Sequence, residues 1–156
     1  MSIPSIHISK PTVHLPGTKL TNEDLIGLVK DNYKNGAAEW PMIEGALRYV
    51  FDRCNSGTRY IETDHSVRVG DFGAKAAKRC LEENNVDPAD VDIVINGSVA
   101  REYFEPSTAM EIAAKVGVRN VHAFDVTSAC AGQLEALHIA SAYFSMYEHV
   151  QNALVV

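Results

Sequence analysis

The chain is predicted to adopt an α/β fold with a mostly parallel sheet and helical crossovers. Three observations predict it. Short apolar runs, typical of strands buried on both faces, occupy residues 91–96, 121–126 and 152–156. Segments with apolar residues at helical spacing separate these runs, and Gly, Asn or Pro marks most junctions. This alternation of strand and helix favours parallel strands joined by helices.

The first third of the chain is predicted to start extended and to continue as two helices. The extended segment covers residues 3–13 and ends before a Pro-Gly turn. Thr21, with an acid three residues later, is the expected N-cap of the first helix, which ends at residues 35–36. The second helix begins near Pro41 and ends at residues 55–57, where Asn, Ser and Gly follow one another.

The middle of the chain is predicted to alternate between helix and strand. Residues 58–62 form a short strand or loop, and helical spacing returns over residues 66–84. After the strand at 91–96, a polar and aromatic loop at 101–105 leads into a helix that Gly117 caps. Five residues are assigned to the buried face of the 66–84 helix: Val69, Phe72, Ala76, Cys80 and Leu81.

One cysteine lies where a predicted strand turns into a helix. The strand at residues 121–126 passes through small residues into a helix that runs to about Tyr147, and Cys130 lies at or near the start of that helix. Unpaired backbone N–H groups and the positive end of the helix dipole favour a thiolate there. A nucleophile on such a turn suits acyl transfer. The alternative is that Cys130 is a small buried hydrophobe in a close-packed helix start.

Composition and charge exclude several classes of protein. The net charge of −6 argues against sequence-independent binding of nucleic acid. The three cysteines contain no CxxC pair, so neither a disulfide framework nor a zinc site is indicated. There is no recognisable signal peptide and no apolar run long enough to span a bilayer. We therefore expect a cytoplasmic protein without membrane or nucleic-acid partners.

Residues 124–132, FDVTSACAG, resemble the nucleophile motif of the type III β-ketoacyl-acyl-carrier-protein synthases. These are condensing enzymes of the thiolase superfamily. The similarity covers about residues 57–156 and includes SGTRYI at 56–61, whereas residues 1–56 match poorly. The resemblance implies that residues 1–156 are the N-terminal half of a thiolase-like domain, a βαβαβ-type unit in which 1–56 is a divergent strand and helical region. The chain also stops inside an apolar run, which supports this interpretation.

The resemblance implies a Claisen condensation of the kind used in fatty acid and polyketide biosynthesis. Cys130 would take an acyl group from coenzyme A or an acyl carrier protein, and a second thioester would supply the carbanion. These thioesters are substrates, and no bound cofactor is implied. The family's catalytic histidine and asparagine come from the C-terminal half, so the fragment alone is expected to be inactive. His138 is no substitute, because it lies roughly 12 Å along the helix from Cys130.

The resemblance also implies contacts for the acyl chain and for coenzyme A. Loop 101–106 resembles the family loop that crosses a homodimer interface to line the partner's acyl pocket, with Phe104 and Thr127 as pocket residues. In the family, the strand that precedes the cysteine pairs with its copy across that dimer. Trp40 and Arg53 are the residues that would contact the adenine and phosphates of coenzyme A. The alternative for Trp40 is a core or lid aromatic.

Glu105 precedes Cys130 by 130 − 105 = 25 positions, as the corresponding pocket residue does in the family. A carboxylate here resembles the condensing enzymes that join two long acyl chains, in olefin biosynthesis or in making dialkylresorcinol and cyclohexanedione rings. In those enzymes a glutamate from the partner subunit acts as a base near the cysteine, and removal of a proton is what carbanion formation requires. The alternative is a solvated Glu105 that forms an ion pair with Arg101.

Two other functions remain open. The chain could be a non-catalytic partner subunit of a ketosynthase pair, although such subunits typically lose the cysteine that is present here. It could also be a thiolase-fold acyltransferase that passes the acyl group to oxygen or nitrogen. The nucleophile half would look the same in condensing and in transferring enzymes.

Overall fold

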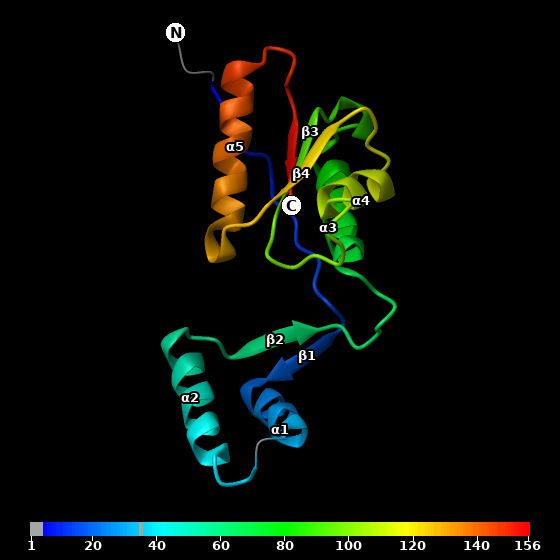
Figure 1. Ribbon diagram of the computed structural model, residues 1–156. Helices are drawn as coiled ribbons and strands as arrows, with labels where there is room; N and C mark the ends of the chain where they lie inside the picture. The colour runs from blue at the N-terminus through cyan, green and yellow to red at the C-terminus, as the bar shows by residue number, and fades with distance from the viewer. Residues whose placement is uncertain (1–4, 35) are drawn as a thin grey trace. The chain divides into compact units, whose positions relative to one another are not determined.

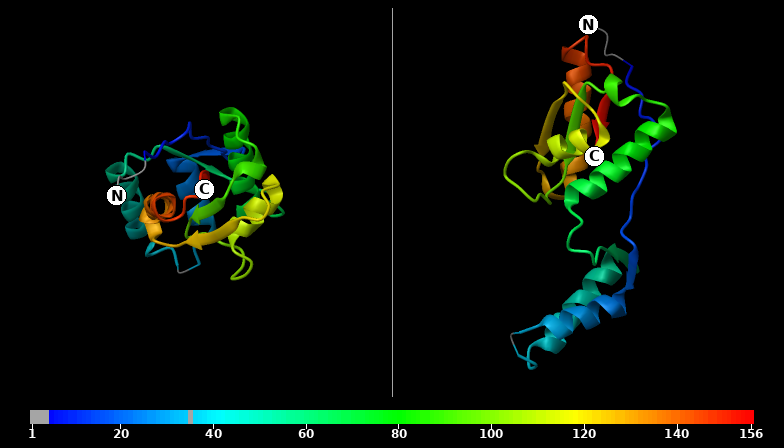
Figure 2. Two further views of the ribbon diagram at one scale, coloured as in Figure 1. Left: turned by 90° about the horizontal axis from the view of Figure 1, so that it is seen from above. Right: turned by 90° about the vertical axis from the view of Figure 1, so that its right-hand side faces the viewer.

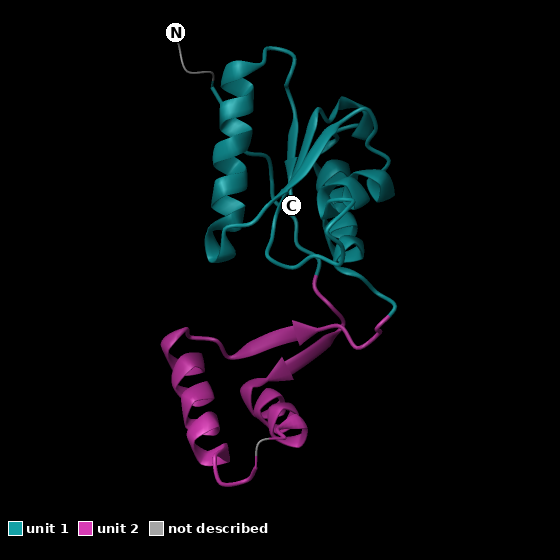
Figure 3. Ribbon diagram, viewed as in Figure 1, with its two compact units in different colours: residues 1–14, 66–156 teal, residues 15–65 magenta. Residues whose placement is uncertain are grey.

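The computed structural model describes residues 5–34 and 36–156, and the chain divides into two compact units (Figure 3). Unit 1 comprises residues 1–14 and 66–156, and unit 2 comprises residues 15–65. The sequence suggests a different division, at residue 56, because resemblance to the family begins there. The contacts place the boundary about ten residues later, after the second strand of unit 2.

Unit 1 is built on a three-stranded parallel sheet, in the order β4-β3-β5 (Figure 1). Strand β3 spans Ile93–Gly97, β4 spans His122–Val126 and β5 spans Ala153–Val155. The predicted parallel α/β arrangement is therefore confirmed. Within a single chain β4 is an edge strand bonded to β3, so the expected pairing with a second copy stays a prediction.

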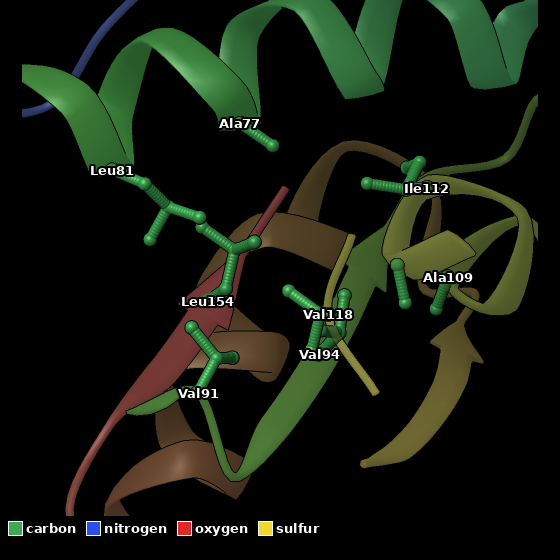
Figure 4. Close-up of a cluster of buried hydrophobic side chains, with 9 residues drawn as sticks. Ala77, Leu81, Val91, Val94, Ala109, Ile112, Val118 and Leu154 are labelled. Atoms are coloured by element: carbon green, nitrogen blue, oxygen red, sulfur yellow. The ribbon is translucent and has the colours of Figure 1, made fainter. Parts of the chain in front are cut away.

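Helices cover both faces of this sheet. Helices α3 (Val69–Asn84) and α4 (Thr108–Val116) pack on one face, and α5 (Gly132–Met146) packs on the other (Figures 1 and 2). Both faces of β3 are buried, as its continuous apolar run predicts. The core on the α3 and α4 side is drawn in Figure 4 and contains Ala77, Leu81, Val91, Val94, Ala109, Ile112, Ala113, Val118 and Leu154. The core on the α5 side contains Ile93, Ile95, Ala136, Ala140 and Val150.

The buried face of α3 differs from the predicted one. Its fully buried residues are Gly70, Ala74, Ala77 and Leu81, whereas most of the larger apolar residues assigned to that face are only half-buried. The reason is the close approach of α4. A Cβ added at Gly73 would lie 2.5 Å from Cδ1 of Ile112. Small residues on α3 let the two helices approach closely. The size of the side chains, and not their hydrophobicity, therefore decides which face of α3 is buried.

Local capping residues end the helices α3 and α4 of unit 1, and Gly117 is the C-cap predicted from the sequence. Ser107 is the N-cap of α4, where its hydroxyl accepts a hydrogen bond from the Met110 N–H at 3.2 Å. Gly117 ends α4 with a φ of 90°, in the left-handed region that glycine adopts freely. Asn85 ends α3 in the same way, with a φ of 54°.

Unit 2 is a pair of helices with a two-stranded antiparallel ribbon. Strand β1 (Thr18–Thr21) pairs with β2 (Thr58–Ile61), and the chain between them forms α1 (Asn22–Asn32) and α2 (Trp40–Arg53). The sequence prediction missed β1. The predicted N-cap of α1 is confirmed, because the Thr21 hydroxyl accepts from the Asp24 N–H at 3.2 Å and the Asp24 carboxylate accepts from the Thr21 N–H at 2.8 Å. Residue 35, where α1 was expected to end, lies outside the described residues.

The expected extended segment near the N-terminus forms no strand over residues 5–14; residues 3 and 4 lie outside the described part. It is held instead along α3. The backbone N–H of Lys10 donates to Oδ1 of Asn84 at 3.1 Å, and the hydroxyl of Thr12 donates to the carbonyl of Ala76 at 2.8 Å. Among the described residues, each helix is too short or too polar to cross a bilayer.

Candidate active site

Cys130 lies on the connection between β4 and α5. One turn of 3₁₀ helix, Ala129–Ala131, links the two elements, and Ala129 adopts a φ of 44° that turns the chain sharply. The Ala131 N–H donates to the carbonyl of Ser128 at 2.9 Å and closes the turn. Cys130 is exposed. The structure therefore places it on the predicted strand-to-helix turn, and it is not the buried hydrophobe of the alternative interpretation.

The start of α5 rests directly on the end of β3. A Cβ added at Gly97 would lie 2.6 Å from the carbonyl oxygen of Gly132, and one added at Gly132 would lie 3.0 Å from the carbonyl oxygen of Gly97. Two backbones meet here with no space for a side chain. This contact fixes the helix end that follows Cys130 relative to the sheet. No side chain of the described chain caps this helix N-terminus.

A half-buried carboxylate with buried polar partners lies on the strand that leads into the turn. The Asp125 carboxylate on β4 accepts hydrogen bonds from the backbone N–H groups of Thr108 at 2.9 Å and Ala109 at 2.8 Å. It also accepts one from Nδ2 of Asn96 at 3.2 Å. Asn96 is opposite Asp125 in the register of β3 and β4 and is only 4% exposed. The sequence analysis missed these contacts, although a carboxylate inside an apolar strand was a signal for them.

The loop before α4 carries the predicted acyl-pocket residues. Phe104 is 90% exposed, and the guanidinium carbon of Arg101 lies 5.5 Å from the centre of its ring. Glu105 is exposed too. Among the described residues no ion pair joins Glu105 to Arg101, and the loop's ion pair is instead Glu102 with Arg68 at 3.2 Å.

Thr127, the other predicted pocket residue, contacts the start of the same loop. Its hydroxyl donates to the carbonyl of Ser98 at 3.3 Å. Thr127 is exposed and precedes Cys130 by three positions. The structure thus brings Thr127 and Ser98, at the start of the loop, together next to the connection that holds Cys130.

Trp40 and Arg53, the predicted coenzyme A contacts, belong to unit 2. Trp40 is 8% exposed, and its indole N–H donates to Oε2 of Glu44 at 2.9 Å. Its ring also lies 5.9 Å from that of Tyr33. These contacts favour the alternative of a core aromatic for Trp40. Arg53 is exposed at the end of α2.

Neither of the other two cysteines lies on a strand-to-helix turn, since Cys54 follows α2 and Cys80 lies within α3. Cys54 and Cys80 are free thiols as well. In the described part of the chain, no three His, Cys, Asp or Glu side chains are grouped so that they could hold a metal ion. Cys130 is thus the one cysteine on a strand-to-helix turn.

Comparison with known sequences relates the chain to acyl-thioester enzymes. Residues 52–147 match the family model of the thiolase N-terminal domain. The chain is 30% identical over 152 residues to the β-ketoacyl-[acyl-carrier-protein] synthase III of Clostridium acetobutylicum, which covers 97% of the chain and 42% of that protein. It is 37% identical over 103 residues to the synthase III of Sulfurovum sp. strain NBC37-1, covering 65% of the chain and 30% of that protein. The chain thus spans well under half the length of these curated relatives.

Solved structures share the fold of this chain. A point variant of OleA from Xanthomonas campestris superposes with a TM-score of 0.74 at 25% identity, covering 92% of this chain and 40% of that one. The 3-oxoacyl-[acyl-carrier-protein] synthase III of Aquifex aeolicus superposes with a TM-score of 0.72 at 28% identity, covering 93% and 42%. AbyA1, a tetronic acid condensing enzyme, shares the fold at 23% identity and a TM-score of 0.68.

Proposed function

Because the chain belongs to the thiolase N-terminal domain family, we propose that it carries the nucleophile of an acyl-thioester condensing enzyme of the β-ketoacyl-acyl-carrier-protein synthase III type. The observation that carries this proposal is the exposed Cys130 on the turn from β4 to α5. The small residues that flank it leave the sulfur open to a thioester. The names of the curated relatives support the substrate class.

In the first step, the Cys130 sulfur attacks the carbonyl carbon of an acyl thioester. A carbon–sulfur bond forms to Cys130, the bond to the carrier sulfur breaks, and the carrier thiol leaves with a proton. The uncapped N-terminus of α5 supports this step, because the positive end of a helix dipole favours negative charge on a nearby sulfur. The carrier is coenzyme A or an acyl carrier protein.

In the second step, a second thioester supplies a carbanion that attacks the acyl group on Cys130. A carbon–carbon bond forms, the bond to the Cys130 sulfur breaks, and the thiolate is regenerated. The carbanion arises by loss of carbon dioxide or of a proton. Stabilising it needs further hydrogen-bond donors, and we assign the histidine and asparagine that supply them to the second half of the fold.

Glu105 is the residue we propose as the base when two acyl chains are joined. Its exposure on a loop, and the absence of an ion pair with Arg101 among the described residues, leave its carboxylate available to another subunit. Phe104, almost fully exposed beside it, would then line the same partner's acyl pocket.

A second copy of the chain fits the outer edge of the sheet. Strand β4 is bonded on one side to β3, and none of the described strands pairs with its other side. Pairing of β4 with its copy across a two-fold axis would give hydrogen-bond partners to the backbone N–H and C=O groups of that edge. For the coenzyme A carrier, the exposed guanidinium of Arg53 is the phosphate contact we propose, and the buried ring of Trp40 makes it the weaker of the two predicted contacts.

The first experiment locates the acyl group. The complete protein is incubated with an acyl-coenzyme A, and the modified cysteine is identified by mass spectrometry. We expect the adduct on Cys130, and its loss in Cys130→Ala. Cys54→Ala and Cys80→Ala are matched controls that should be acylated normally. An adduct on Cys54 or Cys80, with Cys130 unmodified, would contradict the proposal.

The second experiment separates condensation from acyl transfer. Glu105→Gln keeps the size of the side chain and removes the base. We expect this variant to acylate Cys130 at the wild-type rate and to form no carbon–carbon bond between two acyl chains. If Glu105→Gln condenses normally, a plain β-ketoacyl synthase remains. An ester or amide product from the wild type would indicate the acyltransferase alternative, and an unreactive Cys130 in the complete protein would indicate a non-catalytic subunit.

A further inference from the structure

We propose that Asp125 is a positioning residue that sets the place of loop 98–107 relative to the Cys130 turn, and thereby the length of the acyl chain that the enzyme accepts. The inference rests on the proposed function, in which that loop carries Phe104 and Glu105 to the acyl pocket of a second copy. Because the proposed pairing of β4 with its copy fixes the two Cys130 turns relative to one another, a loop that moves relative to its own turn also moves relative to the other one. Asp125 itself touches no substrate in this proposal. It acts through the backbone at the two ends of the loop.

The end of the loop is held by the Asp125 carboxylate. Thr108 and Ala109 are the first two residues of α4, directly after the loop, and their N–H groups donate to Oδ2 and Oδ1 of Asp125 at 2.9 and 2.8 Å. These are two of the N–H groups that a helix leaves without partners at its start. Hydrogen bonds to an ionised carboxylate are about twice as strong as neutral ones, and the helix dipole adds to them.

The start of the loop is tied to the same strand. Asn96, next to the last residue of β3, donates to Oδ1 of Asp125 at 3.2 Å. Thr127, two positions after Asp125 and directly after β4, donates to the carbonyl of Ser98 at 3.3 Å. Both ends of the loop are therefore fastened to the chain segment that leads into the nucleophile turn.

The distance along the chain from this fastening to the nucleophile is short. Cys130 follows Asp125 by 130 − 125 = 5 positions, and the contact between Gly97 and Gly132 holds the far side of the turn. A shift of the Asp125 carboxylate moves the loop and the turn relative to one another. A shift that misplaces the reacting groups by about 1 Å can lower the rate of the reaction by roughly a hundredfold.

The same sheet contains a matched control. The Asp92 carboxylate, just before β3, accepts from the backbone N–H groups of Gln151 at 2.7 Å and Asn152 at 3.0 Å. Asp92 thus makes the same type of contact at the opposite end of β3: its carboxylate, through Oδ2, accepts hydrogen bonds from two backbone N–H groups. None of its described hydrogen bonds involves loop 98–107 or the Cys130 turn. Loss of its charge should affect stability without affecting acyl-chain preference.

The experiment compares Asp125→Asn, Asp92→Asn and the wild type in the complete protein. The rate of acylation of Cys130 is measured by mass spectrometry with acetyl-, octanoyl- and dodecanoyl-coenzyme A. We expect Asp125→Asn to change the ratio of the short-chain to the long-chain rate by about tenfold or more, and Asp92→Asn to leave that ratio unchanged. Asp125→Glu keeps the charge and should restore a ratio closer to that of the wild type.

A second measurement needs no activity. Hydrogen exchange of the amides in residues 98–109 should accelerate in Asp125→Asn and stay as in the wild type in Asp92→Asn. If Asp125→Asn does not fold, Asp125→Glu takes its place in both measurements, with a smaller shift in the same direction.

The outcomes separate the two proposals. If the wild type is acylated on Cys130 and the Asp125 variants keep its chain-length ratio, the positioning role is wrong and the proposed function stands. Unchanged exchange in residues 98–109 also overturns the positioning role. If no thioester acylates Cys130 in the wild type, the proposed function fails, and this inference fails with it.

Discussion

Units 1 and 2 are stabilised in different ways. In unit 1, three consecutive residues of β3, Ile93 to Ile95, are 0–1% exposed, and helices cover both sides of the strand. In the described part of unit 2, only Ile26 and Trp40 are buried hydrophobic residues, at 5% and 8% exposure. Burial of apolar surface is the main favourable term in folding. This term therefore stabilises unit 1 far more than unit 2.

Unit 2 relies more on contacts of charged side chains. The Arg48 guanidinium bonds to the carboxylates of Glu23 at 2.9 Å and Glu44 at 2.8 Å. The Arg59 guanidinium carbon lies 4.3 Å from the centre of the Phe51 ring. Exposed ion pairs such as that of Arg48 with Glu23 contribute little each. The difference teaches that the proposed nucleophile, Cys130, lies in the unit whose core can hold a backbone turn rigidly.

Removing a buried side chain from unit 1 should have the largest effect on stability. Ile112 on α4 is 1% exposed and packs in the core of Figure 4. We expect Ile112→Ala to lower the free energy of unfolding by about 2–5 kcal/mol. The matched change in unit 2 is Leu28→Ala, at a side chain that is 44% exposed, and it should cost less than about 1 kcal/mol. Denaturant unfolding with peptide-resolved hydrogen exchange measures both losses. Equal losses of stability in the two variants would contradict the proposed difference between units 1 and 2.

Adding one methyl group beside the nucleophile turn should have the next largest effect. In Gly97→Ala the new Cβ would lie 2.6 Å from a backbone oxygen of Gly132, so α5 must move. We expect a loss of about 1–3 kcal/mol, together with a large fall in the rate of Cys130 acylation because the turn moves with the helix. Thermal unfolding and acyl-adduct mass spectrometry test this. A variant that unfolds earlier but is acylated normally would show that the turn does not depend on the contact.

The same substitution in unit 2 should have the opposite sign. Gly45 is exposed within α2, and a Cβ there would have no atom within 4 Å. Alanine is the better helix former, so Gly45→Ala should raise the free energy of unfolding by about 0.5–1 kcal/mol. Chemical denaturation followed by the fluorescence of Trp40, the single tryptophan of the chain, reports on this unit. A destabilised Gly45→Ala would mean that α2 makes contacts there that the described chain does not contain.

Acid should weaken unit 2 through Arg48. Hydrogen bonds from Arg48 lower the pKa of Glu23 and of Glu44 below the ordinary value of 4.5. A carboxyl whose pKa is lower in the folded state contributes stability above its unfolded pKa and loses that stability as the pH falls through the folded pKa. The unfolding midpoint read from Trp40 should therefore fall as the pH drops below about 4.5. Since Glu23 and Arg48 are exposed and Glu44 is only half-buried, the effect is small, and salt should reduce it.

Arg48→Gln is the control for the acid effect. This substitution removes the cation. The unfolding midpoint should therefore change less between neutral pH and pH values below about 4.5 than it does in the wild type. An Arg48→Gln variant with the wild-type pH dependence would assign the acid sensitivity to another carboxyl of unit 2, such as Asp24, whose pKa the hydrogen bonds from Thr21 lower.

Much of unit 1 was predictable from local patterns. The apolar run of β3, the Ser107 N-cap and the Gly117 C-cap all act over a few residues, so the sequence displays them directly. The turn at Cys130 was predictable for the same reason, because small residues separate a strand pattern from a helical one.

The remainder depends on partners that are distant in sequence. Strand β1 is only four residues long, and its partner β2 begins about 40 positions later, so no local pattern marks it. The buried face of α3 depends on how closely α4 approaches, which favours glycine and alanine over the larger residues that hydropathy selects. The role of Asp125 depends on the register between β3 and β4, which places Asn96 beside it.

The pairing of β1 with β2 has a consequence for how this chain can be edited. Thr18 lies opposite Ile61 in the ribbon, so the points at which the chain enters and leaves the α1–α2 segment are neighbours, about 5 Å apart between Cα atoms. A segment whose two ends meet in this way has the topology of an insertion. It can be shortened, exchanged or replaced by a linker of a few residues while the connection between residues 14 and 66 is preserved. Residues 19–60 can therefore be redesigned as one segment, and a variant without them would also show whether the proposed coenzyme A contact of Arg53 is needed.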